Sequence, residues 1–235
     1  MDHMAELRAR LREKQFATLS GMLLAFNSGF INACCVAGFA LGMPEQPVAG
    51  VTGAYTRAAM GTDLPIFQAA LIGCFVAGSA VTSLINPRPT PYRLTPHYGP
   101  TFLIGAALLS AAHLMEASRA VYLLIVAANG VQNGVSSLYS ANLVRTSHMT
   151  GSSTDVGVVL GQLARGNWTD LWKLCVLLGL ASAFALGSLT SCAVIATMHR
   201  SALICSAALF TLIGLGCIAF GETPAAAQPA DYTHL

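Results

Sequence analysis

The sequence contains few charged residues, with 12 Lys and Arg and 10 Asp and Glu among 235 positions, or 9%. A soluble domain carries about 25%. By contrast, 54% of the residues are hydrophobic, and several apolar runs approach the roughly 20 residues that cross a bilayer as a helix. The composition therefore predicts an integral membrane protein, with the lipid bilayer as a partner. The net charge of only +2 gives no indication of nucleic-acid binding.

Motifs for cleavage, metal binding and catalysis are also lacking. No A-x-A site follows a short apolar stretch, so we expect the first 15 residues to be retained. The seven cysteines fall in apolar runs without C-x-x-C or Cys-His metal spacing, which favours small buried side chains over a disulfide framework or a zinc site. There is no G-x-S-x-G, no H-E-x-x-H and no carboxylate pair within an apolar run. We expect no enzymatic activity, no cofactor and no metal.

The apolar runs predict six membrane-spanning helices in a domain covering residues 17–220. They lie near residues 17–43, 64–85, 100–116, 120–142, 171–197 and 201–220. Residues 1–16 form a basic segment whose spacing predicts a short amphipathic helix at the membrane surface. Residues 221–235 are rich in Pro and Ala and are expected to be a disordered tail.

Lys and Arg are unevenly distributed between the two sides of these six spans. Nine fall on the side shared by both termini, namely Arg8, Arg10, Arg12, Lys14, Arg88, Arg93, Arg145, Arg165 and Lys173. The other side has three, Arg57, Arg119 and Arg200. Because cytoplasmic loops carry the excess of basic residues, we expect an inner (plasma) membrane protein with both termini in the cytoplasm.

Two pairs of short motifs indicate an internal repeat. G-F-I-N-A at 29–33 precedes T-G-A-Y-T at 52–56, and G-V-Q-N-G at 130–134 precedes T-G-S-S-T at 150–154. The Asn residues are 101 positions apart and the Thr-Gly pairs 98. The halves, about 17–116 and 120–220, have three spans each, so the second would be inverted relative to the first. The predicted fold is an all-α polytopic membrane helix bundle, with six transmembrane helices arranged as an inverted 3+3 repeat.

The Thr-Gly turns combine a residue that permits a sharp backbone break with hydroxyls that can cap a helix, and each precedes a helix-compatible stretch ending at Gly61 or Gly161. Exposed N–H groups at a helix start suit an anionic or polar ligand. An ordinary helix cap at the membrane interface is the alternative. A second ambiguity concerns Asn129, Gln132 and Asn133, which share one helix face. They favour either a hydrogen-bonded helix–helix contact or a solute-lining surface.

Several of these motifs resemble the YoaK-like bacterial membrane proteins, a six-span family catalogued as a domain of unknown function. A-A-N-G-V-Q-N-G (127–134) and V-R-T-S-H-M-T-G-S-S-T-D-V-G (144–157) are similar to its second-half signature, and the resemblance extends over about 17–220. In the first half, Asn32 stands where the family usually has an acid, and Ala54 where it has Asn. If that acid carries protons in relatives, this chain lacks it. The resemblance implies no substrate.

Together these features favour a transporter or permease-like protein for a small polar or anionic solute. The expected solute-lining residues are Asn32, Thr52, Gly53, Thr56, Gln132, Asn133, His148, Thr150, Gly151, Thr154 and Asp155. His148 and Asp155 are the candidate titrating groups, His148 because histidine changes charge near physiological pH.

The rival hypothesis is a non-transporting scaffold or assembly subunit. It would use the Gly-x-x-x-Gly pairs at 38–42, 130–134 and 157–161 for close helix packing, which is also compatible with a homo-oligomer.

Overall fold

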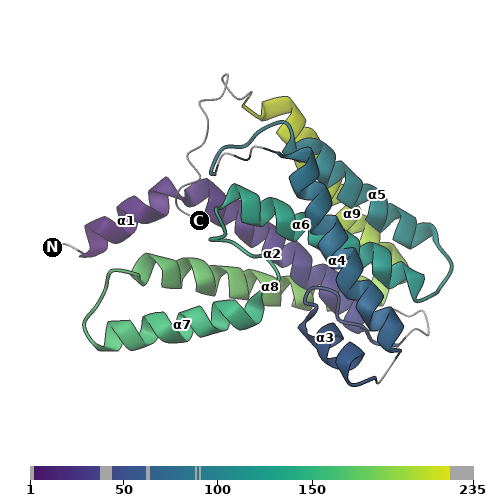
Figure 1. Ribbon diagram of the computed structural model, residues 1–235. Coiled ribbons are helices and arrows are strands. Elements are labelled where there is room, and N and C mark those ends of the chain that lie inside the picture. The colour runs from purple at the N-terminus through teal and green to yellow at the C-terminus, as the bar shows by residue number, and fades with distance from the viewer. Residues whose placement is uncertain (1–2, 38–43, 62–63, 88, 90, 223–235) are drawn as a thin grey trace.

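The computed structural model describes residues 3–37, 44–61, 64–87, 89 and 91–222, and every regular element in these ranges is helical (Figure 1). The predicted all-α class is confirmed. The elements are α1 (His3–Glu13), α2 (Gln15–Val36), α3 (Thr52–Ala59), α4 (Pro65–Ile85), α5 (Tyr98–Leu114), α6 (Ala120–Tyr139), α7 (Met149–Ala164), α8 (Leu171–Met198), a 3-10 turn η2 (His199–Ser201) and α9 (Ala202–Phe220).

Four segments within the described residues are long and apolar enough to cross a membrane. They are Gln15–Val36, Pro65–Ile85, Ala120–Tyr139 and Leu171–Phe220, and the last contains both α8 and α9. Tyr98–Leu114 is apolar but shorter. Each of the six predicted spans therefore coincides with a helix, although α2 ends at Val36 and most of the predicted remainder, 38–43, lies outside the described residues.

The long helices pack in pairs that are distant in sequence. α2 lies along α8, α4 along α6, and α5 along α9 and α6. The two shorter helices accompany one member of a pair, α3 beside α4 and α7 beside α8 (Figure 1). Because apolar surface is hidden along each pair, the long helices are held as one bundle, with a large buried cluster centred on α2, α5, α6 and α9.

Glycines allow the closest approach between paired helices. A Cβ at Gly29 of α2 would collide with the carbonyl group of Phe184 in α8, and one at Gly130 of α6 would collide with that of Phe75 in α4. Gly130 lies 101 positions after Gly29, and Phe184 lies 109 positions after Phe75. The two contacts therefore join the same residue types, at offsets of 101 and 109.

A second set of contacts obeys the same two offsets. A Cβ at Gly187 would meet the carbonyl group of Phe26, and one at Gly78 would meet that of Ala127. Ala127 follows Phe26 by 101 positions and Gly187 follows Gly78 by 109. The α2–α8 and α4–α6 pairs are thus joined by the same glycine-to-carbonyl arrangement.

Serine hydroxyls complete this correspondence. Ser188 Oγ donates to the carbonyl oxygen of Gly29 at 3.1 Å, and Ser79 Oγ donates to that of Gly130 at 2.9 Å. Ser188 is again 109 positions after Ser79. Each hydroxyl donates to the carbonyl oxygen of a close-packed glycine on the facing helix, which satisfies the serine inside an apolar bundle.

The expected packing role of the Gly-x-x-x-Gly pairs is confirmed in one case. Gly130 and Gly134 both face α4, where a Cβ would meet Phe75 or Thr82. Gly157 and Gly161 pack against no other helix of the described chain, because a Cβ built at either has no neighbouring atom within 4 Å. They lie on the exposed side of α7. The pair at 38–42 lies outside the described residues.

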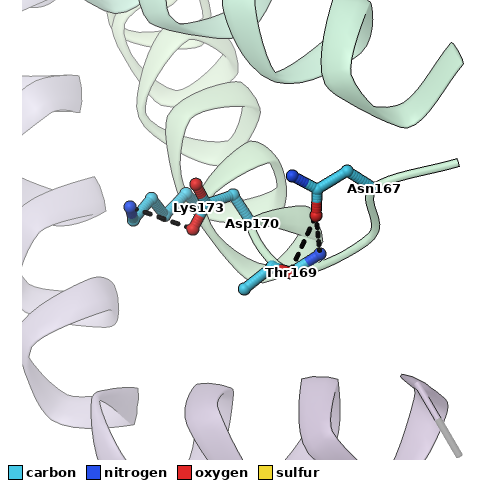
Figure 2. A network of polar contacts seen from close by, with 4 residues as sticks. All are labelled: Asn167, Thr169, Asp170 and Lys173. Atoms are coloured by element: carbon cyan, nitrogen blue, oxygen red, sulfur yellow. Dashed lines mark hydrogen bonds and ion pairs between the residues drawn. The ribbon is translucent and has the colours of Figure 1, made fainter. Parts of the chain in front are cut away.

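α7 is longer than the repeat suggested. We expected its end at Gly161, but the helix continues to Ala164, and the chain reverses at Gly166, whose φ of 81° favours glycine. Asn167 Oδ1 then accepts hydrogen bonds from Thr169 N (3.2 Å) and Thr169 Oγ1 (2.8 Å) (Figure 2). Asp170 pairs with Lys173 at 2.9 Å at the start of α8 (Figure 2). This compact turn sets α7 antiparallel to α8.

Candidate functional site

Each Thr-Gly turn is the start of a short helix. α3 begins at Thr52 and α7 at Met149, one residue before Thr150. The expected caps from Thr and Ser side chains are wrong, because the residues before these helices, Val51 and His148, make no side-chain capping bond. Threonines in the second turn bond backwards along their own helices instead. Among the described residues, the N–H groups of both first turns therefore have no capping side chain, as is the case at helix starts that receive a ligand.

The repeated asparagines fix the irregular backbone in front of these two helices. Asn32 Oδ1 accepts hydrogen bonds from the backbone N–H groups of residues 48 and 49, both at 2.9 Å. Asn133 Oδ1 accepts from Thr146 Oγ1 and from Ser147 N, both at 3.2 Å. The offset of 98 that relates the Thr-Gly pairs also relates 48–49 to 146–147. Both amide oxygens thus hold equivalent stretches of chain against α2 and α6.

One cavity of about 680 Å³ is shared by the two turns. Its walls include Pro47, Ala49, Gly50, Val51 and Thr52 from the first half, and Arg145, Ser147, His148, Met149 and Thr150 from the second. Each residue of the first set corresponds to one of the second at the offset of 98. Even the skipped positions match, since Val48 and Thr146 are both buried.

The helices complete the cavity wall with a mixture of apolar and hydroxyl groups. They contribute Asn32, Phe75, Ser79, Ser83, Asn133, Gly134, Ser137, Leu138 and Phe184. Phe75 and Phe184 are the residues whose carbonyl groups meet the close-packed glycines. A cavity of this size, with a few convergent polar groups on an apolar wall, has the ordinary character of a small-molecule site.

The ionisable residues that line the cavity are all basic, among the residues that the structure describes. Arg145 and His148 line it, whereas none of its described lining residues is a carboxylate. The equivalent positions in the first half, Pro47 and Gly50, are uncharged. Arginine is positive throughout the physiological pH range, and the starts of α3 and α7 add the partial positive charge of helix N-termini. The arrangement suits a polar or anionic solute.

The expected site residues fall into three groups. Asn32, Thr52, Asn133, His148 and Thr150 line the cavity. Gly53, Thr56, Thr154 and Asp155 are exposed on α3 or α7, away from the described lining. Gly151 is beside the cavity wall, and a Cβ there would collide with the imidazole of His148. A side chain at this position would therefore displace His148.

Gln132 is enclosed within the bundle and joins α2 to α6. Its Oε1 accepts from Asn27 Nδ2 at 2.9 Å, and its Nε2 lies within 3.0 Å of three acceptors, Leu24 O, Ser28 Oγ and Thr146 Oγ1. Ser28 Oγ also donates to Asn129 Oδ1 at 3.1 Å. Of the two alternatives for the amide face, Gln132 and Asn129 fit the helix–helix contact. Asn133 alone takes part in the cavity wall.

Apart from His148, the sequence interpretation missed the lining residues just before each Thr-Gly pair, including Arg145 and Ser147. A usable signal was present, because extending the offset of 98 upstream aligns 47–51 with 145–149. The two stretches have no identical residue at any of the five positions, so matching of motifs did not find them. Phe75 and Phe184 had no comparable signal, since only the folded helices bring them to the cavity.

A family model described as "Protein of unknown function (DUF1275)" matches residues 20–216, from α2 to α9. The chain belongs to this family. It is the family of the YoaK-like proteins, so the resemblance drawn from the two motifs is confirmed. The match includes both Thr-Gly turns and every described lining residue of the cavity. No curated protein and no solved structure has significant similarity to the chain.

Proposed function

We propose that this DUF1275 protein is a transporter or permease for a small polar or anionic solute and has no enzymatic activity. The observation that carries this proposal is the single cavity lined by equivalent residues of both Thr-Gly turns. Interrupted helices that meet around one site, contributed by two halves of a chain, are typical of secondary transporters. Irregular backbone inside a membrane is tolerated where it is packed in protein or lines a wet cavity.

The proposed architecture is six spans in an inverted 3+3 repeat, with α2, α4 and α5 in one half and α6, α8 and α9 in the other. Support comes from the matched contacts. The offset of 101 relates residues of α2 to residues of α6, the offset of 109 relates α4 to α8, and the α2–α8 contact thereby corresponds to the α6–α4 contact. α2 and α6 meet where Ser28 bonds Asn129, a pair that the offset of 101 also relates. Asn32 and Asn133 each lie four residues further along, about 6 Å from that point in opposite directions.

In the proposed topology, the protein lies in the inner (plasma) membrane and both of its termini are in the cytoplasm. Three charged residues of the predicted cytoplasmic side, Lys14, Arg93 and Glu222, lie at one end of the bundle. Lys14 Nζ lies 4.3 Å from the centre of the Tyr92 ring, and Arg93 Nε lies 3.8 Å from Glu222 Oε2. Arg119 directly precedes α6, and the last residue of α6, Tyr139, contacts Tyr92. Arg119 therefore lies at the opposite end of the bundle. This grouping agrees with the excess of basic residues on one side.

In this proposal the solute is bound by positive groups converging from both halves. The first-turn N–H groups of α3 and α7 would donate to it, and the Arg145 guanidinium would supply the full charge and a planar pair of donors. Ser147 and the helix serines offer further hydrogen bonds. Of the two candidate groups His148 and Asp155, only His148 lines the cavity, where its ring nitrogens can hydrogen-bond to the solute.

The test is a thermal-shift panel on the purified protein. Anionic probes (phosphate, sulfate and mono- and dicarboxylates) are compared with neutral polyols and sugars, because a ligand that binds the folded state raises its apparent stability. We expect at least one anion to raise the Tm and Arg145→Gln to weaken its binding about ten-fold or more. The solute so identified is then tested for uptake into proteoliposomes.

Arg165→Gln is the matched control, because Arg165 is exposed just after α7 and outside the described cavity lining. It should leave binding unchanged. If no probe shifts the Tm, or if a bound solute is not taken up, the scaffold hypothesis is favoured and the transport proposal fails. An effect of Arg165→Gln equal to that of Arg145→Gln would contradict the assignment of the cavity.

A further inference from the structure

A second cavity, of about 540 Å³, forms a groove between α2, α5, α6 and α9. It shares no lining residue with the first, among the residues that the structure describes. Its deep part is lined by carbon-rich side chains such as Leu24, Phe102 and Ile213, and its mouth by Phe16 and Phe220, which are 58% and 84% exposed. An exposed apolar mouth of this kind, on a chain of membrane-length helices, faces lipid rather than water.

The groove breaks the correspondence between the two halves. α5 packs extensively against α6, whereas α2 and α9, which occupy the equivalent places in the proposed repeat, make only limited contact and are separated by the groove. An apolar gap without an occupant loses packing contacts on every wall. The groove therefore has a shape and a surface that an acyl chain would fill.

Tyr98 gives independent evidence of a ligand. It lines the groove, is 1% exposed, and its Oη is enclosed from water without a hydrogen-bond partner among the described residues. The serine hydroxyls of the groove, by contrast, bond to backbone carbonyl groups, as Ser20 does to Phe16 O at 2.7 Å. A buried tyrosine hydroxyl normally finds a partner. A ligand oxygen at this end of the groove would supply it.

The same end of the groove carries a positive charge. The rings of Tyr98 and Tyr92 both contact the ring of Tyr139 edge-to-face, with centroids 6.2 and 6.4 Å apart. Lys14 Nζ lies 4.3 Å from the centre of the Tyr92 ring. A cation and an unpartnered phenol thus stand at one end of an otherwise apolar groove, which is the complement of an amphiphile with an anionic head.

We propose that this groove binds an anionic phospholipid, with one acyl chain between α2 and α9, an ester oxygen accepting from Tyr98 and the headgroup near Lys14. On the proposed topology this end faces the cytoplasm, where anionic lipids attract basic residues close to the membrane. The lipid site itself does not depend on transport. A second copy of the chain is the alternative occupant.

Native mass spectrometry of delipidated protein, titrated with phosphatidylglycerol or phosphatidylcholine of identical chains, tests the proposal. We expect phosphatidylglycerol to bind more tightly, and Lys14→Gln to weaken it about five-fold and remove the preference. Tyr98→Phe should weaken the binding of both lipids without lowering the Tm, since it removes only a hydroxyl that has no partner among the described residues. A purely structural role for Tyr98 would leave lipid binding unchanged.

Gly216→Leu tests the location, because Gly216 lines the groove and a Cβ there meets no atom within 4 Å. Gly216→Leu should weaken the binding of both lipids at least ten-fold. Gly73→Leu, at an equally open position on the exposed side of α4, should leave lipid binding unchanged. Unchanged lipid binding by Gly216→Leu would overturn the proposal. So would a dimer that Gly216→Leu dissociates while lipid binding is retained, which would identify a second copy as the occupant.

Discussion

At the scale of single residues, the oxygen of Asn32 shows what an amide does at a position where the family resemblance implies an acid. Oδ1 accepts two backbone N–H groups at 2.9 Å, and this geometry uses an acceptor oxygen and not a charge. Asn133 does the same for the second half. The role of both residues is therefore to hold the backbone before α3 and α7, whatever else a carboxylate contributes in relatives.

Replacing Asn32 tests whether its acceptor oxygen holds the backbone before α3. Asn32→Ala leaves two backbone donors without their acceptor, at a cost of about 1–3 kcal/mol for each. Asn32→Asp keeps an acceptor oxygen and should therefore lower stability by less than Asn32→Ala does. Thermal unfolding of the purified protein measures both. Equal stability of Asn32→Ala and the unchanged chain would show that these bonds do not hold the segment.

The residue scale also shows the limit of sequence interpretation at the site. Helical spacing predicted that Asn129, Gln132 and Asn133 share a face, and all three point toward α2 or the segment before α7. Spacing alone does not say whether that face meets another helix or a cavity. Gln132 was expected to line the site but is enclosed, because Asn27 and Ser28 of α2 supply its partners.

At the scale of elements, the long helices could be predicted because their ends are set locally. Apolar runs end at charged residues or at prolines, and Pro65 stands at the first position of α4, where its missing N–H is harmless. Pairing between helices had no such local signal. The contacts of α2 with α8 and of α4 with α6 depend on glycines more than 45 residues from the carbonyl groups they meet, so only the folded chain reveals them.

Glycine substitution tests this pairing. Gly29→Ala and Gly130→Ala each place a methyl group on a carbonyl of the facing helix, so we expect similar losses of about 1–3 kcal/mol, the usual cost of overpacking. Gly157→Ala, in open space on exposed α7, should instead be neutral or stabilise by up to about 1 kcal/mol.

Thermal unfolding of the three variants distinguishes them. A loss at Gly157 comparable to those at Gly29 and Gly130 would show that contact with a facing carbonyl group is not the cause of the losses. A loss at only one of Gly29 and Gly130 would contradict their equivalence.

At the scale of the whole molecule, the sequence repeat predicted more than its motifs contained. The offsets of 98 and 101 that relate the Thr-Gly pairs and the Asn residues also relate the cavity walls and the glycine contacts of α2 and α6. The third offset, 109 for α4 and α8, could not be predicted because those helices share no motif. The inverted arrangement itself stays a proposal, supported by these matched contacts.

The most direct test is sided labelling of Thr52→Cys and Thr150→Cys, in a chain without its native cysteines, by a membrane-impermeant maleimide. Both residues line the cavity, so the account predicts that both react, that each becomes accessible from either face of the membrane as the cavity changes its opening, and that a bound solute slows both. Thr56→Cys on exposed α3 and Ala25→Cys, fully buried in α2, are the accessible and inaccessible controls. Protection of Thr52→Cys and Thr150→Cys from both faces under every condition would contradict the account.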